Sequence, residues 1–336
     1  MNILVTGGAG FIGSHTVVEL LNKNYKVIVV DNFCNSKREV VNKIKEIAHK
    51  DFIFYEIDVC DAEKMEEIFK NHQIDCVIHF AALKSGADSI RNPGLYYSNN
   101  LQSTYVLVTL MEKYNVKKLI FSSSATVYGN SKNVPILETE IIGNVISPYG
   151  MTKYLIELYL NNKANSSKNF KVISFRYFNP IGAHPTGLIG EDSPDETPNN
   201  LMLYMLKVAN RSLPYLNIFG NDYQTSDGTG IRDFIHVVDL ALGHIAAIDY
   251  FDKMSGFYDV FNLGTGKGYT VMQLVHAFED INGVKIPCKV VGRRPGDVEI
   301  SYASVEKAKK ILNWKANYSI EDCVKDAWNF AVKKNA

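Results

Sequence analysis

A glycine-rich turn joins the first apolar run of the chain to its first helical stretch, and this junction constrains the fold more than any other feature. Gly7, Gly10 and Gly13 follow the run Ile3–Thr6 and lead into the stretch Phe11–Asn22. Glycines at this spacing allow a tight turn, a close approach of the backbone to a pyrophosphate, and close packing of a helix on a sheet. Phosphate oxygens would there meet free N–H groups and the positive end of the helix. The turn therefore predicts a dinucleotide site.

Short apolar runs alternate with longer helical stretches through the first half of the chain. The runs are rich in Val and Ile, as is typical of buried parallel strands: Ile3–Thr6, Lys26–Val30, Phe52–Ile57, Cys76–Phe80, Leu119–Ser122 and Lys171–Tyr177. The helical stretches are Phe11–Asn22, Ser36–His49, Ala62–Asn71, Leu95–Tyr114 and one that starts near Tyr149. Strands that alternate with helices of this length form βαβ units with right-handed crossovers. We therefore predict an α/β fold with a doubly wound parallel sheet of the Rossmann type.

From Asn179 the chain changes character. Pro180, Pro185, Pro194 and Pro198 indicate that the segment up to Asn200 is mostly loop, and a long loop in a compact chain is usually functional. The elements expected after it are a helix Leu201–Asn210, a strand Leu216–Phe219, a loop Gly220–Gly230, a helix from Val237, a strand Val260–Leu263, a helix Val271–Asn282 and two C-terminal helices. We therefore predict a dinucleotide-binding domain of residues 1–178 and a smaller α/β substrate-binding lobe of residues 179–336, with segments that return across the boundary.

The charge balance and the cysteine pattern argue against several classes of protein. The 336 residues include 36 Lys plus Arg and 36 Asp plus Glu, and this zero net charge speaks against a nucleic acid or an anionic membrane as partner. No run reaches the ~18 apolar residues of a spanning helix, and no signal peptide is apparent. The cysteines are few and far apart, so we expect no disulfide framework, no metal site and a cytoplasmic location: Cys34, Cys60, Cys76, Cys288 and Cys323.

An acidic residue ends the second predicted strand, as a dinucleotide site of this type requires. The carboxylate of Asp31 can accept hydrogen bonds from a ribose 2′-hydroxyl and repel a 2′-phosphate, which favours NAD over NADP. Lys37 and Arg38 follow closely and could hold a phosphate, so NADP stays open as an alternative. Asp58 and Val59, at the end of the third strand, either border the adenine or form an ordinary polar strand end.

Tyr149 and Lys153 are four residues apart at the start of a helical stretch, so both project from one face. A tyrosine is a poor base at neutral pH because its unperturbed pKa is ~10. At ~5 Å and an effective dielectric of ~20, one neighbouring positive charge contributes about 3 kcal/mol, or roughly two pKa units. The Lys153 ammonium and a nicotinamide ring would supply two such charges. We therefore expect Tyr149 to be the catalytic base, with its pKa lowered toward neutrality if desolvation does not cancel the effect.

A serine-rich strand supplies a third candidate catalytic residue. Ser124 ends this strand, at the edge where open α/β sheets bind ligands. Its hydroxyl could hydrogen-bond the reacting oxygen and pass a proton to Tyr149, whereas Ser122 and Ser123 are expected to serve mainly in packing and backbone hydrogen bonding. His79, which ends another strand without a second ligand, is expected to be a hydrogen-bonded core residue.

Several motifs spread over both predicted lobes resemble one enzyme family. The GxxGxxG turn with Tyr149 and Lys153 is similar to the extended short-chain dehydrogenase/reductase superfamily. Longer motifs resemble the UDP-galactose 4-epimerase family within it: DNFCNSKR (Asp31–Arg38), SSSATVYG (Ser122–Gly129), SPYGMTK (Ser147–Lys153), RYFNPIGAHP (Arg176–Pro185), PNNLM (Pro198–Met202), FGNDYQTSDGTGIRDFIHVVDLA (Phe219–Ala241) and RRPGD (Arg293–Asp297).

The resemblance implies an NAD-dependent isomerase that interconverts UDP-galactose and UDP-glucose. In this family Tyr149 would take the 4-hydroxyl proton while NAD⁺ takes the C4 hydride. The resulting 4-keto sugar rotates about its diphosphate and receives the hydride on its other face. The resemblance further implies a homodimer, paired through the helices Leu95–Tyr114 and Tyr149–Leu160.

The resemblance also assigns contact residues, carried over position by position. Those expected at the cofactor are Gly7, Gly10, Phe11, Ile12, Gly13, Asp31, Asn32, Asn35, Ser36, Asp58, Val59, Phe80, Ala81, Ala82, Lys84, Asn99, Ser122, Tyr149, Lys153, Tyr177 and Phe178. Those expected at the UDP-sugar are Lys84, Ser124, Tyr149, Asn179, Asn200, Leu201, Phe219, Arg232, Phe234, Arg294, Asp297 and Ser301. Among these, Tyr177 and Phe178 would flank the nicotinamide, and arginine side chains suit diphosphate oxygens.

Two positions depart from the family pattern. Ser301 stands where the family often has a large aromatic residue that closes the sugar pocket, unless Tyr302 occupies that place through a local shift. A small side chain leaves room for a 2-acetamido group, so we expect UDP-GlcNAc and UDP-GalNAc as further substrates. Phe234 stands where a tyrosine is common, and one hydroxyl contact is lost.

Two other functions remain as alternatives. A nucleotide-sugar 4,6-dehydratase or a decarboxylase shares the glycine turn and the Tyr–Lys pair, but a dehydratase has Asp-Glu where this chain has Ala125 and Thr126, neither of which exchanges protons near neutral pH. A non-enzymatic NAD sensor would not need a base such as Tyr149.

Overall fold

Seven strands of the described chain form one parallel sheet. The structure is a computed structural model, and it describes residues 1–167, 169–192, 198, 200–294 and 296–335. In sheet order the strands are β11 (Tyr258–Leu263), β6 (Lys171–Tyr177), β5 (Lys118–Ser124), β4 (Cys76–His79), β1 (Asn2–Thr6), β2 (Lys26–Asp31) and β3 (Ile53–Glu56). The α/β fold with a doubly wound parallel sheet is thereby confirmed. The strand order reverses beside β1, which is where such sheets bind ligands at their carboxyl ends.

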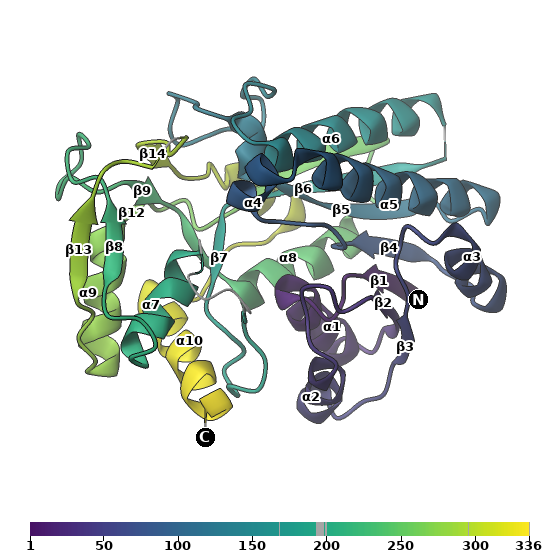
Figure 1. Cartoon of the computed structure of the whole chain (residues 1–336). Helices are drawn as coiled ribbons and strands as arrows, with labels where there is room; N and C mark the ends of the chain where they lie inside the picture. The colour runs from purple at the N-terminus through teal and green to yellow at the C-terminus, as the bar shows by residue number, and fades with distance from the viewer. Residues whose placement is uncertain (168, 193–197, 199, 295, 336) are drawn as a thin grey trace.

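Helices cover both faces of this sheet (Figure 1). One face carries α1 (Phe11–Asn22), α2 (Glu39–Ala48) and α8 (Val237–Tyr250). The opposite face carries α3 (Ala62–Asn71), α5 (Pro93–Lys113) and α6 (Pro148–Ser166), and the short α4 (Gly86–Arg91) packs beside α5 and α6. Each face holds its own buried apolar cluster, so the sheet is buried on both sides, as its Val- and Ile-rich strands predict.

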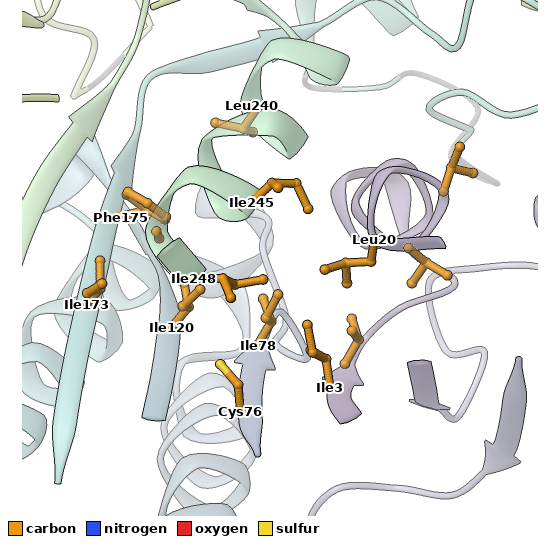
Figure 2. Close-up of a cluster of buried hydrophobic side chains, with 14 of the residues drawn as sticks. Ile3, Leu20, Cys76, Ile78, Ile120, Ile173, Phe175, Leu240, Ile245 and Ile248 are labelled. Carbon is orange, nitrogen blue, oxygen red and sulfur yellow. The ribbon is translucent and has the colours of Figure 1, made fainter. Parts of the chain in front are cut away.

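Two elements from the second half of the sequence complete the first lobe. β11 pairs in parallel with β6, and α8 packs against α1. Figure 2 shows Ile245 of α8 facing Leu20 of α1, and Ile248 of α8 beside Ile78 and Ile120 of the strands. Both elements come from the part of the sequence after Asn179, and the predicted division into two lobes at that residue stays a prediction.

The second lobe is built from short strands and a few helices. It contains β7 (Asn179–Ile181) paired with β10 (Phe234–His236), β8 (Leu216–Phe219) paired with β13 (Cys288–Val291), and β9 (Ile231–Arg232) between β12 (Tyr269–Thr270) and β14 (Ile300–Ser301). Its helices are α7 (Leu201–Ala209), α9 (Val271–Asn282), α10 (Ile320–Asn335) and a one-turn π-helix (Ala308–Leu312). Strands of two or three residues are too short to show a period of their own, which is why the sequence does not predict β7, β9, β10, β12 or β14. Of the two four-residue strands it predicts β8 and misses β13.

Some boundaries differ from the prediction. α2 begins at Glu39 rather than Ser36 because the Ser36 hydroxyl instead donates to Asp31 at 2.9 Å. β7 occupies the first three residues of the predicted loop 179–200, and residues 193–197 and 199, which include Pro194, lie outside the described residues. Within the described chain, no helix combines the length and the apolar character needed to cross a membrane.

The glycine turn after β1 leaves no room for side chains. A Cβ at Gly7, whose φ is +69°, would lie 2.6 Å from the backbone nitrogen of Ala81 after β4. A Cβ at Gly13 would lie 2.2 Å from the carbonyl oxygen of Gly7. Both positions therefore require glycine for α1 to start close to the sheet edge.

We predict that Gly13→Ala lowers the melting temperature and weakens NAD⁺ binding at least about tenfold, which is ~1.4 kcal/mol, because the added methyl group displaces the turn. Gly94→Ala is the matched control, since nothing lies within 4 Å of a Cβ built there. Thermal denaturation and NAD⁺ titration of both variants provide the measurement. Unchanged NAD⁺ affinity in Gly13→Ala would contradict the steric explanation.

Candidate active site

A deep cavity of about 760 Å³ lies at the carboxyl ends of the central strands, within the range typical of ligand sites. Its walls include every residue predicted at the cofactor, from the turn Gly7–Gly13 to Tyr177 and Phe178. Four residues predicted at the sugar also line it: Lys84, Ser124, Tyr149 and Asn200. The fold thus brings segments that are far apart in the sequence to one site.

One end of the cavity fits a dinucleotide diphosphate and its ribose. Gly10 is the N-cap residue of α1 and has no side chain to cap it, so the first N–H groups of the helix suit phosphate oxygens. Asp31 is buried, and its Oδ2 accepts a hydrogen bond from the backbone of Ala9 at 3.0 Å. Its Oδ1 accepts from Phe33 N and Ser36 Oγ, each at 2.9 Å. The carboxylate is therefore held rigidly at the edge of the cavity.

Lys37 and Arg38, the two residues that could have held the 2′-phosphate of NADP, each pair with a carboxylate in the structure. Lys37 Nζ lies 2.7 Å from Asp192 Oδ2, and the Arg38 guanidinium pairs with Glu56. A 2′-phosphate would have to compete with these carboxylates and would also face Asp31. The arrangement favours NAD.

The other end of the cavity brings Tyr149 and Lys153 together on the first turns of α6. Ser147 caps this helix by accepting from Gly150 N at 3.2 Å, and Pro148 occupies its first position. The Lys153 amine is buried, donates to the carbonyl oxygen of Ser122 at 2.6 Å, and lies 5.9 Å from the centre of the Tyr149 ring. The lysine thus lies between the serine strand and the tyrosine.

The protein alone does not lower the pKa of Tyr149, and the lowering expected for a site that also holds the nicotinamide charge stays a prediction. Burial raises the pKa of Tyr149 to about 12, although a hydrogen bond with Ser124 opposes the rise. Burial also lowers the pKa of Lys153 to about 7, and the Glu157 carboxylate opposes this change. Desolvation disfavours both the phenolate and the ammonium ion, so in the protein without ligand it outweighs the charge of Lys153 alone. A further positive charge at the site is therefore needed for a phenolate to form near neutral pH.

Ser124 is oriented by its neighbours in the short 3₁₀ turn Ala125–Tyr128. Its Oγ accepts from the backbone N of Thr126 at 3.2 Å and from the Thr126 hydroxyl at 3.0 Å. With both acceptor directions engaged, its own hydrogen is left to donate toward Tyr149 or a bound sugar oxygen. Ser124, Tyr149 and Lys153 are thus gathered at one point, as predicted.

A buried polar network that sequence reasoning missed supports this group. Glu157 follows Lys153 by one helical turn and pairs with Arg176 of β6 at 2.7 Å. It also accepts from Ser123, and Arg176 donates to Tyr128 Oη at 3.0 Å. Its position on the same face of α6 as Lys153 is the signal that could have identified Glu157. The network fixes α6 against β5 and β6.

The remaining residues predicted at the sugar lie in the second lobe, outside the described lining of the cavity. The guanidinium of Arg294 is 5.3 Å from the centre of the Phe219 ring and pairs with Asp297 at 2.9 Å. Burial lowers the pKa of Arg232, and the negative charge of Asp297 opposes this change, so the three charged groups lie near one another. Contacts of these residues with a nucleotide stay a prediction.

The other residues predicted at the sugar lie in short strands or at the start of one helix of the second lobe. Asn179 begins β7, and Leu201 begins α7 directly after its cap, Asn200. Ser301 of β14 pairs in register with Arg232 of β9. Phe234 is 4% exposed and packs in the apolar core of the lobe, which gives a packing reason for an aromatic residue there.

Two histidines have structural roles. His79 is buried, with Nδ1 2.7 Å from Thr6 Oγ1 and Nε2 3.1 Å from Thr104 Oγ1, so it is a hydrogen-bonded core residue as expected. His244, which the sequence does not single out, lies 2.6 Å from the hydroxyl of Tyr177 and fixes that ring at the cavity wall.

Sequence reasoning also missed one side of the cavity. The segment Gly187–Asp192 and three residues of α10 line it opposite α2: Phe330, Lys333 and Lys334. No local motif marks these residues, because they reach the cavity only through the packing of the two lobes.

Comparison with known proteins shows that the chain is similar to UDP-glucose 4-epimerases over nearly its whole length. The model of a family described as "NAD dependent epimerase/dehydratase family" matches residues 3–264. A UDP-glucose 4-epimerase of Pasteurella multocida is 48% identical over 333 residues, which are 99% of this chain and 98% of that protein. The crystal structure of a UDP-glucose 4-epimerase from Bifidobacterium longum in complex with NAD⁺ and UDP has a TM-score of 0.95 and 46% identity, covering 100% of this chain and 99% of that one. A UDP-glucose 4-epimerase from Stenotrophomonas maltophila with bound NAD and formylated UDP-arabinopyranose has a TM-score of 0.97 and 42% identity, with the same coverage.

Lys153→Met should change how the stability of the nucleotide-free protein depends on pH. The wild type bears the full cost of a buried charge below the folded-state pKa of about 7, and this cost disappears as the pH approaches the ordinary lysine value of 10.5. The free energy of unfolding of the variant minus that of the wild type should therefore fall by roughly 3 kcal/mol between about pH 6.5 and about pH 9.5.

Chemical denaturation at the two pH values measures this difference, and Lys253→Met, at an exposed position, is the control. A difference that stays constant or grows with pH would show that the Lys153 amine is not destabilised by burial.

Proposed function

Because the chain belongs to the NAD dependent epimerase/dehydratase family, we propose that it interconverts UDP-galactose and UDP-glucose by oxidation and reduction at C4 through a 4-keto sugar. The cofactor is NAD. The observation that carries the proposal is one continuous cavity, with Asp31 and the glycine turn at one end and Ser124, Tyr149 and Lys153 at the other. Such a site can hold a dinucleotide with its reactive ring beside a base.

The protein's part in the chemistry is proton transfer at the 4-hydroxyl oxygen. When bound, NAD⁺ supplies the hydride acceptor and the positive ring charge that the buried phenol lacks. Tyr149 then takes the 4-hydroxyl proton, and the Lys153 ammonium stabilises the phenolate form. Ser124 donates a hydrogen bond to the sugar oxygen, since its acceptor positions are occupied by Thr126. The same groups return the proton in the reverse step.

Inversion requires an anchored nucleotide and a sugar that is free to turn. We assign the uridine diphosphate to the second lobe, with Arg232 and Arg294 toward the phosphate oxygens and Asp297 toward a ribose hydroxyl. The mutual proximity of these charged groups supports the assignment. Asn200, at the start of α7, joins this region to the cavity.

The alternatives fit the site less well. Ala125 and Thr126 occupy the positions of the acid and base that a 4,6-dehydratase needs, and the Thr126 side chain is engaged with Ser124. A non-enzymatic NAD sensor would not require a buried lysine beside a tyrosine, which is costly to maintain.

Tyr149→Phe should reduce turnover of UDP-galactose by about 10²- to 10⁴-fold, the usual contribution of a general base, while NAD stays bound. The measurement is UDP-glucose formation without any added hydride acceptor, together with the NAD content of the purified protein. Tyr215→Phe removes a hydroxyl from an exposed ring and serves as control. Near-normal turnover of Tyr149→Phe would require another base.

We further infer that UDP-GlcNAc and UDP-GalNAc are substrates. Ser301 and Arg232 are paired in register on neighbouring parallel strands, so their side chains lie on the same face. The Tyr302 ring lies beside Gly268, 3.3 Å from a Cβ built at that glycine, and this packing argues against a shift that fills the place of Ser301. The small serine therefore supports a pocket with room for a 2-acetamido group.

Ser301→Tyr should lower kcat/KM for UDP-GalNAc by at least about tenfold and change that for UDP-galactose by less than about threefold, because only the larger sugar needs the space. A coupled assay with both substrates on wild type and variant gives the two ratios. Ser301→Ala is the control, since it keeps the pocket open. If Ser301→Tyr kept the wild-type kcat/KM for UDP-GalNAc, the proposal that Ser301 leaves room for the acetamido group would be refuted.

Two further expectations belong to the proposed function. A homodimer paired through α5 and α6 is supported by exposed apolar side chains on these helices, namely Leu95, Tyr105 and Leu158. A cytoplasmic location is supported by the cysteines, which are all free thiols in the described chain.

A further inference from the structure

We propose that the segment Gly187–Asp192 is a strap that holds the cofactor in its cavity, fastened by the adjacent carboxylates of Glu191 and Asp192. These two acids are positioning residues in this proposal, which rests on the proposed function only in taking NAD as the ligand. The segment belongs to the second lobe by sequence, yet it lines the same cavity as the glycine turn and Asp31.

Asp192 joins the strap to both sides of the cavity mouth. Its Oδ2 lies 2.7 Å from Nζ of Lys37, which follows β2 in the first lobe. Its Oδ1 lies 2.5 Å from Nζ of Lys334 near the end of α10. Although partial burial opposes it, hydrogen bonds from Lys334 and Lys37 lower the pKa of Asp192, so the carboxylate is charged at neutral pH. One side chain thus spans the mouth where the adenosine ribose is expected.

Glu191 makes a second connection of the same kind. Its Oε1 accepts from Nζ of Lys84 at 2.7 Å, and Lys84 follows β4 in the first lobe. Its Oε2 accepts from Nδ2 of Asn200 at 2.8 Å, and Asn200 caps α7 in the second lobe. Both partners line the cavity and are predicted to contact the cofactor or the sugar. The Glu191 carboxylate therefore ties the strap to both lobes.

The two connections flank the glycine turn, because β2 and β4 are the neighbours of β1 on its two sides. A dinucleotide lying across the carboxyl end of β1 would have to pass the strap to leave. Retention of this kind suits the reaction, since the hydride must be returned by the same cofactor molecule that received it.

Asp192→Asn should increase the dissociation rate of NAD⁺ about fivefold at ~50 mM salt, and Glu191→Gln/Asp192→Asn should increase it further. The holoprotein is diluted into alcohol dehydrogenase and ethanol, which reduce released NAD⁺ and report it by absorbance. Asp252→Asn is the matched control, because it breaks an exposed ion pair with Lys118 of β5, and neither residue lines the cavity.

Salt and a second variant separate a fastening role from a general structural one. At ~1 M salt the screening length falls to about 3 Å, so the rate ratio of Asp192→Asn to wild type should approach one. Lys37→Met should release NAD⁺ faster as well, and Asp192→Asn/Lys37→Met should be no faster than Asp192→Asn alone, since both changes break one connection.

The strap proposal would be refuted if NAD⁺ left Asp192→Asn and Glu191→Gln/Asp192→Asn at the wild-type rate. It would also be refuted if the ratio of the Asp192→Asn rate to the wild-type rate did not change with salt. These outcomes leave the proposed epimerase untouched, because they concern only how NAD⁺ leaves. Failure of the wild-type protein to bind NAD⁺ would instead overturn the proposed function along with the strap.

Discussion

The burial of one amine, that of Lys153, sets the condition on which the rest of the site depends. Removed from water, this group and the neighbouring phenol of Tyr149 both favour their neutral forms. In the proposed reaction the pair acts as acid and base only when the cofactor brings a further positive charge. If Tyr149 is the base, as we propose, binding of the dinucleotide and activation of the tyrosine would be one event.

The buried amine of Lys153 is held in place by the neighbouring polar network around Glu157. The ion pair of Glu157 with Arg176 is almost fully buried, and its partners reach from α6 to β5, β6 and β11 through Ser123, Tyr128 and Asn262. Breaking such a pair typically costs about 3–5 kcal/mol, because one charge is left without a partner. The network thus holds the helix that carries Tyr149 and Lys153 against the strand that carries Ser124.

The two lobes are joined by more than their connecting loops. α8 and β11 place a late part of the sequence in the first core, and Glu191 and Asp192 link the second lobe to loops after β2 and β4. The first kind of link is a buried apolar core, whereas the second consists of ion pairs beside the cavity. In the proposed reaction, the second kind of link would retain the dinucleotide while nucleotide sugars exchange.

Local patterns in the sequence were sufficient to predict the six strands β1 to β6, the glycine turn, Asp31 and the group of Ser124, Tyr149 and Lys153. Each depends on neighbours within about one helical turn or one strand, where periodicity and spacing carry the information. Only the tertiary structure decided that β11 joins the first sheet, that Tyr149 is buried enough for desolvation to raise its pKa, and that Asp192 meets Lys37. These outcomes arise from contacts between residues far apart in the chain, and from the water that such contacts exclude.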